Sequence, residues 1–170
     1  MDLQTARLEL LPLSLDDWTL FKDLYLDKQV MALCFDPLSL DELKARFHVK
    51  TQPWSCLATY WLCLVVVDKH TKQKVGITGF CLQQGVAEVG YMFLPQFYGR
   101  GYATESLDIL IDWAKQVHGI NHYLATVTEG NIASERVLSK VGFNLNKIIP
   151  NASFIGGKLY DDYIYHLSLK

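Results

Sequence analysis

The sequence lacks a long apolar run and an export signal. Its longest strongly apolar run, residues 61–67, has the length of a strand and falls far below the roughly 20 residues that a membrane-spanning helix needs. The N-terminus shows no basic segment followed by an apolar one, which is the pattern of a secretory signal. We therefore expect a soluble, cytoplasmic protein that has no membrane partner.

Paired cysteines and a metal-binding motif are also absent from the sequence. None of the four cysteines has Cys-x-x-Cys spacing, and most stand among apolar neighbours, which favours reduced, buried thiols over disulfides or zinc ligands. His118 and His122 are four residues apart, but Gly119 between them should end the helix that a shared metal would require. We expect no metal. The cysteines are Cys34, Cys56, Cys63 and Cys81.

Neither sign of charge is in strong excess. The net charge of −2 argues against a general nucleic-acid binder, so we expect no direct nucleic-acid partner. The charge is nevertheless uneven, because residues 1–42 contain nine Asp or Glu and three Lys or Arg, and the remaining chain contains nine and 13. Either the first part attracts a cationic amine and the second an anionic cofactor, or the acidic residues only complement helix dipoles.

The chain has the length of one domain, and its 50% hydrophobic content can fill a substantial core, so we expect a single domain over residues 1–170. Alternating and helical apolar periodicities predict one strand, two helices and then an antiparallel meander. A strand, a helix and a parallel strand follow, and then a last helix and a terminal hairpin. The predicted strands are 7–11, 61–68, 75–82, 87–94, 123–127, 144–149 and 160–169, and the predicted helices open at Ser14 and Ser39 and cover 102–118 and 131–141.

The most informative segment joins the strand at 87–94 to the helix at 102–118 through two glycines. Gly99 and Gly101 have no Cβ, so an anionic group can approach the backbone amides at the positive end of the helix. A dinucleotide fingerprint would need a glycine at Thr104, and a Walker loop would need Lys and Ser or Thr directly after Gly101. We therefore expect this loop to hold a pyrophosphate of another kind.

Three motifs in order resemble the GNAT acetyltransferase superfamily. Gln96-x-x-Gly99-x-Gly101 followed by Tyr102-Ala103 resembles its acyl-CoA pyrophosphate motif, and residues 87–94 and 129–143 resemble the strand before it and the helix and strand after it. Residues 5–10 are similar to the branch of ribosomal-protein N-terminal acetyltransferases (RimJ/RimL-like), although Leu11 stands where that branch commonly has arginine.

This resemblance implies a fold and a cofactor. The fold would be a mixed α/β (α+β) structure with a mostly antiparallel central sheet and helices on both faces. The sheet would splay between its fourth and fifth strands, residues 87–94 and 123–127. The cofactor would be acetyl-CoA (coenzyme A). The cofactor-binding residues that the resemblance implies are Gln96, Phe97, Gly99, Arg100, Gly101, Tyr102, Ala103 and Asn131.

Some of these loop and cap residues have a second interpretation. Arg100 would either add positive charge to the phosphates or point into water. Phe97 and Tyr98 are expected to pack the loop against the core. Asn131 is a natural N-cap by itself, and the resemblance also places it beside the pantetheine arm.

The resemblance also implies the catalytic residues. Glu88 would take a proton from the amine, often through water, although a strand glutamate that faces solvent would have the same sequence pattern. Ser134 would protonate the departing thiolate, with Tyr91 as a weaker substitute. These roles together correspond to direct attack of the amine in a ternary complex, without a covalent enzyme intermediate.

The acceptor that the resemblance implies is a primary amine, and the ionisation of amines favours one kind. An N-terminal α-amine needs less help than a lysine, because roughly a tenth of α-amines are unprotonated at neutral pH. We therefore expect a protein N-terminus, such as that of a ribosomal protein, with two alternatives: a small amine (polyamine or aminoglycoside) or acyl-CoA binding without catalysis. Phe35, Trp54 and Tyr60 would form the acceptor side or plug the core. The protein could be a monomer or a homodimer.

Overall fold

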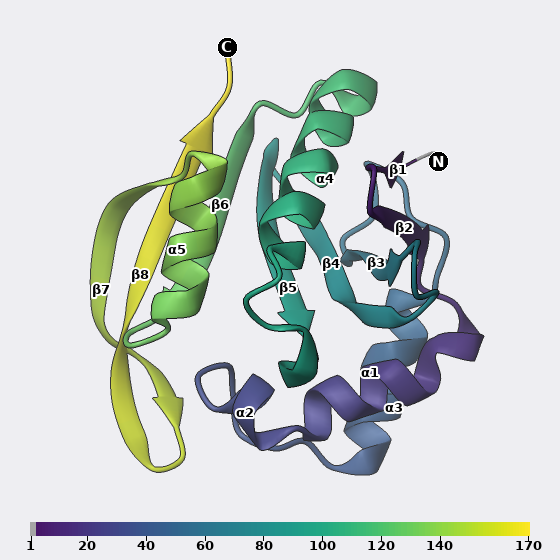
Figure 1. Ribbon diagram of the computed structural model, residues 1–170. Helices are drawn as coiled ribbons and strands as arrows, with labels where there is room; N and C mark the ends of the chain where they lie inside the picture. Colours follow the sequence, from purple (N-terminus) through teal and green to yellow (C-terminus); the bar gives the residue numbers. More distant parts are fainter. Residues whose placement is uncertain (1–2) are drawn as a thin grey trace.

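A sheet of eight strands forms the centre of the computed structural model, which describes residues 3–170 (Figure 1). The strand order is β1-β2-β3-β4-β5-β6-β8-β7, and among these described strands only the β5–β6 pair is parallel. The strands are β1 (Leu3–Gln4), β2 (Leu8–Pro12), β3 (Leu62–Asp68), β4 (Lys74–Gln83), β5 (Val86–Phe93), β6 (His122–Thr128), β7 (Asn144–Ile155) and β8 (Lys158–Ser168).

Five α-helices cover the two faces of this sheet. Along β3, Leu64 and Val66 enter one core with helices α4 and α5, whereas Val65 and Val67 enter a second core with α1, α2 and α3. Figure 1 shows α4 and α5 side by side on one face. The helices are α1 (Trp18–Leu26), α2 (Lys28–Met31), α3 (Leu40–Lys50), α4 (Tyr102–His118) and α5 (Ile132–Val141). No helix of the described chain is long and apolar enough to cross a membrane.

Strands β5 and β6 separate soon after they begin. They pair at three positions only, and the last pair is Glu88 with Leu124. Beyond this pair, β5 continues to Phe93 and β6 continues to Thr128 without pairing with each other. Strand β6 stays hydrogen bonded to β8 along its whole length. The predicted fold class is therefore confirmed, including the splay between the strands predicted at 87–94 and 123–127.

The helices begin and end where local chemistry predicts. At the start of α3, Ser39 Oγ accepts a hydrogen bond from the Glu42 amide at 3.3 Å, and the Glu42 carboxylate accepts one from the Ser39 amide at 2.8 Å. This reciprocal pair satisfies two amides that the helix itself leaves free. Helix α4 ends at Gly119, whose φ of +67° suits glycine.

Several sequence predictions are wrong in detail. Helical spacing within the helix predicted at 102–118 puts Val117 on its apolar face, but Val117 is 59% exposed, and Cys56 is exposed rather than buried. The connection between the strands predicted at 144–149 and 160–169 is instead mostly strand, because β7 continues to Ile155. The edge position of β7 and its register shift tolerate Pro150 there. The helix opened by Ser14 begins as a 3-10 turn, and β1 and α2 were not predicted.

A buried carboxylate connects β3 to the beginning of α4. Asp68 accepts hydrogen bonds from the Tyr102 hydroxyl and from the amides of His70 and Thr71, at 2.8 and 2.9 Å for the two amides. The bond from Tyr102 and then the amide bonds lower the pKa of Asp68 to about 2, against the opposing effect of burial. This contact fixes the first residue of α4, Tyr102. It directly follows the loop that contains Gly99 and Gly101, which we call the glycine loop.

The substitution Asp68→Asn should destabilise the fold in a pH-dependent way. At pH 7 we expect the free energy of unfolding to fall by about 2 kcal/mol, because the hydrogen bonds to a charged acceptor are lost. The pKa of Asp68 is lowered in the folded state, so its contribution is complete above about pH 4 and is lost as the pH falls towards 2. Urea unfolding at pH 7, 5 and 3 measures this, with exposed Asp16→Asn as the control. If the free energies of unfolding of wild type and Asp68→Asn differ by the same amount at all three pH values, the lowered pKa of Asp68 would be contradicted.

Candidate active site

The loop between β5 and α4 presents free amides to an open surface. Gly99 and Gly101 have φ values of +74° and +79°, which favour glycine. A Cβ added at Gly99 would have no neighbour within 4 Å, and one at Gly101 would meet only Arg7 Nη2 at 3.6 Å. Within residues 3–170, no acceptor receives a hydrogen bond from the amides of Gly99, Arg100 or Gly101. The loop therefore has both the donors and the clearance for an anionic group.

Arg7 supports this loop from the opposite side, a role that the sequence analysis missed. Its Nη1 donates to the Arg100 carbonyl at 3.2 Å, and its Nε donates to Glu105 at 2.9 Å. In a trans peptide the carbonyl and the next amide point in opposite directions, so the Gly101 amide points away from Arg7. The pKa of Arg7 is raised, first by its hydrogen bond with Glu105. Arg7 thus holds the peptide in the orientation that exposes its amide.

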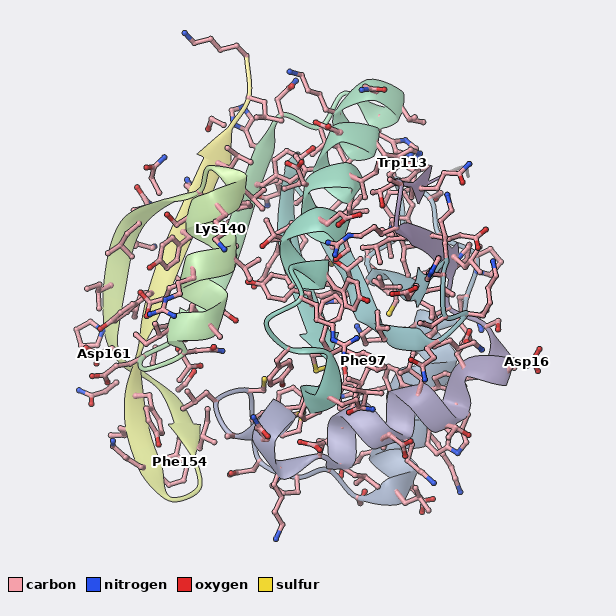
Figure 2. All side chains as sticks on the ribbon, viewed as in Figure 1. Asp16, Phe97, Trp113, Lys140, Phe154 and Asp161 are labelled. Atoms are coloured by element: carbon pink, nitrogen blue, oxygen red, sulfur yellow. The ribbon has the colours of Figure 1, made fainter. Side chains whose placement is uncertain are left out.

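Other loop side chains take different positions. Phe97 is buried as predicted, in the segment that joins β5 to α4 (Figure 2). The prediction that Tyr98 also packs against the core is wrong, since it is 46% exposed. Arg100 lies with its guanidinium 5.6 Å from the centroid of the Phe97 ring. Tyr102 points inward to Asp68, so only its backbone faces the loop surface. Gln96 is exposed and Ala103 is half-buried.

Tyr91 and Ser134 meet across the space between β5 and α5. The Tyr91 hydroxyl donates a hydrogen bond to the Ser134 carbonyl at 3.2 Å, and Asn131 Oδ1 accepts one from the Ser134 amide at 3.2 Å. Asn131 is therefore the N-cap of α5, as predicted from the sequence. Burial raises the pKa of Tyr91, so its hydroxyl stays protonated. Within residues 3–170, no hydrogen bond involves Ser134 Oγ.

Glu88 lies where β5 and β6 begin to separate. Its carboxylate accepts a hydrogen bond from Thr126 Oγ1 of β6 at 3.3 Å. Because side chains alternate along a strand, Glu88 shares a face with Gly90 and Met92, and Tyr91 points to the opposite face. The structure thus brings Tyr91, Ser134 and Asn131 together on the α5 side and leaves Glu88 on the side of α1 and α3.

A cavity of about 700 Å³ lies on the same side of the sheet as Glu88. Gly90, Tyr91 and Met92 of β5 contribute to its wall. Two of the three aromatic residues considered for the acceptor side, Phe35 and Tyr60, line it. Trp54 does not. Its ring packs 5.2 Å from that of Phe80 and 5.5 Å from that of His118, measured between centroids. The other lining residues are Tyr25, Ala45, Arg46, Val49, Lys50, Thr59, Trp61, Leu62, Cys63, Ile77, Thr78 and Gly79.

The β7–β8 hairpin reaches the segment that carries Phe35. The Gly156 amide at the hairpin turn donates to Asp36 Oδ1 at 2.7 Å. Phe154, near this turn, is 63% exposed (Figure 2). The contact joins segments 120 residues apart in the chain, so it could not be inferred from local sequence patterns.

The curated relatives match only part of the chain. An uncharacterized N-acetyltransferase of Bacillus subtilis (strain 168), YoaA, is 28% identical over 102 residues, which is 58% of each chain. Across the curated relatives, the matched region spans 46–59% of their length.

Solved structures match nearly the whole chain at low identity. A spermidine N-acetyltransferase of Vibrio cholerae, in complex with CoA and spermine, has a TM-score of 0.83 at 19% identity and covers 96% of both chains. A ribosomal-protein-S5-alanine acetyltransferase of Vibrio fischeri has a TM-score of 0.77 at 15% identity, over 99% of this chain and 96% of that one. At this identity the likeness shows a shared fold.

The family model described as the acetyltransferase (GNAT) domain matches residues 7–144, which include the strands β2 to β6, the glycine loop and α5. This chain therefore belongs to the GNAT acetyltransferase family.

Proposed function

We propose that the protein is an acetyl-CoA-dependent N-acetyltransferase that acetylates a primary α-amine by direct attack, with both substrates bound at once. The observation that carries this proposal is the position of β5. Its end leads into the glycine loop, and Gly90, Tyr91 and Met92 within it line the cavity. One strand therefore borders both a site suited to a phosphate-bearing donor and a site suited to an acceptor.

The glycine loop fits the pyrophosphate of acetyl-CoA. The free amides of Gly99, Arg100 and Gly101, with those of the first turn of α4, would bind its oxygens at the positive end of the helix dipole. Gln96, which is exposed, and the Arg100 guanidinium lie at the edge of the loop. Asn131 would hold the pantetheine arm while it caps α5. Acetyl-CoA would supply the acetyl thioester to the space between β5 and β6.

Glu88 would act as the base. Attack requires a neutral amine, and the carboxylate lies on the cavity side of the sheet at the point where β5 and β6 part. Its hydrogen bond from Thr126 fixes the carboxylate at this edge. An amine in the cavity would give its proton to Glu88 directly or through water. The neutral amine would then face the space between β5 and β6, where the acetyl thioester would lie.

Ser134 would act as the acid that protonates the departing thiolate. Its amide and carbonyl are held by Asn131 and Tyr91, and its hydroxyl is free to turn towards a ligand. Tyr91 would be the substitute acid, because its hydroxyl lies at the same place and stays protonated. Base and acid would thus act from opposite sides of the separated strands, one on the amine and the other on the thiolate.

An α-amine suits this cavity better than a polyamine. Solved structures with this fold include acetyltransferases of both ribosomal-protein and spermidine substrates, so the fold does not choose between them. A polyamine carries several positive charges, which carboxylates would have to bind. None of the residues that line the cavity, within residues 3–170, is Asp or Glu.

An acetyl-transfer assay tests the proposed function. We expect thiol release from acetyl-CoA in the presence of peptides with a free N-terminus, with the acetylated product confirmed by mass. Peptides with a blocked N-terminus, polyamines and aminoglycosides provide the comparison. Release only with polyamines would overturn the acceptor class. Tight binding of acetyl-CoA without transfer to any of these amines would favour binding without catalysis.

The substitution Gly101→Val should abolish acetyl-CoA binding. Valine adds bulk to the loop surface and disfavours the φ of +79°, so we expect the dissociation constant to rise at least about 100-fold. Calorimetric titration measures it. Gly85→Val is the matched control, because Gly85 has a φ of +81° in the turn between β4 and β5, outside the glycine loop. Equal affinity of a folded Gly101→Val protein and the wild type would remove the loop from the cofactor site.

The catalytic assignments predict slow turnover with intact cofactor binding. We expect Ser134→Ala and Glu88→Gln each to lower kcat by about tenfold to 1,000-fold, while the acetyl-CoA dissociation constant changes less than about twofold. The Glu88→Gln defect should grow as the pH falls, since more of the amine is then protonated. Ser139→Ala and Glu129→Gln, both exposed, are the controls. Normal turnover of Ser134→Ala would transfer the acid role to Tyr91 or water, and normal turnover of Glu88→Gln would remove the base.

A further inference from the structure

The cavity beside β5 contains two cations. Arg46 and Lys50 lie one turn apart on α3, and both contribute to its wall. Within residues 3–170, no carboxylate lines the cavity. Its local charge is therefore positive, although the first 42 residues of the chain are strongly acidic.

Aromatic rings of the cavity wall hold both cations in place. Lys50 Nζ lies 4.8 Å from the centroid of the Trp61 ring, and the Arg46 guanidinium carbon lies 4.8 Å from that of Phe35. Such contacts orient a cation without neutralising it. The position of the ammonium group is thus set by the cavity wall.

Trp61 connects the Lys50 ammonium to the reaction site. Its ring covers Gly90, because a Cβ added at Gly90 would lie 3.0 Å from a ring atom. Gly90 is two residues after Glu88 and directly before Tyr91 on β5. A ligand group bound by Lys50 would therefore lie beside the strand that carries the proposed base.

The Lys50 ammonium has no negative partner in the described part of the chain. Ion pairs there join Arg7 to Glu105, Lys44 to Asp41 and Lys74 to Asp17, and none involves Lys50. The groups that act on its charge are Arg46, which is also positive, and the thiols of Cys63 and Cys81. Burial raises the pKa of Cys63 to about 11, so this thiol is neutral. Burial also lowers the pKa of Lys50, which shows that its charge is poorly solvated.

Arg46 is only partly neutralised. It lies one turn after Glu42, and the pKa of Glu42 is lowered, first by the hydrogen bonds from Ser39 and in smaller part by Arg46. A carboxylate in the cavity could interact with both cations, which lie one turn apart on α3. Lys50 is half-buried and Arg46 is exposed. A partly desolvated cation without a negative partner is unfavourable, and an anionic ligand would offset that cost.

We propose that the acceptor is a primary amine that also carries an anionic group, and that Lys50, with Arg46, binds this group. The inference rests on the proposed function, because it takes the cavity as the acceptor site. The anionic group would bind to the cations of α3, and the amine of the same substrate would point towards Glu88. Two sources share this chemistry: the carboxylate of a free α-amino acid, and an acidic side chain near the N-terminus of a peptide.

Matched acceptor pairs test the inference. One arm compares glutamine and alanine with their α-amides, and the other compares N-terminal peptides that have Glu or Gln at the second position. Rates are expressed per unprotonated amine. We expect kcat/KM to be at least about tenfold higher for the anionic member in one arm, and that arm identifies the source. Equal rates within every pair, or faster reaction of spermidine, would overturn the inference while leaving the acetyltransferase assignment intact.

Variants of α3 test whether Lys50 causes the preference for anionic acceptors. Lys50→Met should remove the preference chiefly by raising KM for the anionic acceptor, and Lys50→Arg should restore part of it. Lys44→Met is the control, since Lys44 lies on the same helix, is exposed and does not line the cavity. A preference that survives Lys50→Met in the folded protein would exclude Lys50 as the anion ligand.

A binding measurement separates failure of this inference from failure of the proposed function. N-acetylglutamate and N-acetylglutaminamide, the neutral analogue in which both carboxylates are replaced by amides, are titrated into the wild type and Lys50→Met by calorimetry, without any turnover. We expect the free acid to bind at least about tenfold more tightly to the wild type and equally to Lys50→Met. Equal binding of the two probes to the wild type would overturn the anion site even if acetyl transfer occurs. Preferential binding of the acid would support the anion site even if the tested amines are not acetylated.

Discussion

The short parallel pairing of β5 and β6 is the constraint on which the rest of the structure depends. Parallel neighbours need a crossover connection, and here α4 and the loops at its two ends supply it. The glycine loop is the first part of this crossover, so it must lie at the end of β5. The strands separate after Glu88, because β6 stays paired with β8 while β5 stays paired with β4. The positions of the glycine loop, of the space between β5 and β6 and of the cavity therefore all depend on where the β5–β6 pairing ends.

Alternation along β5 then divides the chemistry between the two faces of the sheet. Glu88 and Gly90 belong to the side of α1 and α3, where the cavity lies, whereas the Tyr91 hydroxyl reaches the Ser134 carbonyl at the start of α5. A shift of one residue in the register of β5 would exchange these faces and separate each group from its partner. The eight-residue pairing of β5 with β4, from Gly76 with Phe93 to Gln83 with Val86, fixes that register.

Local patterns in the sequence predict the features that depend on local chemistry. The capping box at Ser39, the helix end at Gly119 and the glycine loop all arise from backbone groups and side chains a few residues apart. Other features come from residues distant in the chain. The contact of Arg7 with the Arg100 carbonyl spans 93 residues, and the cavity joins α3 to β3, β4 and β5, so no short window contains either of them. Tertiary packing also left Val117 exposed at the end of α4, where its helical spacing placed it on the apolar face.

The charge pattern shows why the average charge of a segment does not predict the chemistry of a site. Several acidic residues of the first 42 positions have partners within the fold: Asp17 is hydrogen bonded to Lys74 and Ser14, Asp27 caps α2, and Asp36 holds the β7–β8 hairpin. Residues that already have such partners do not by themselves require a cationic acceptor. Arg46 and Lys50 of α3, by contrast, follow the acidic segment in the sequence and line the cavity. Residues of the acidic segment form part of the same cavity wall. What an acceptor would meet is set by which side chains face the cavity, and the charged ones among these, Arg46 and Lys50, are positive.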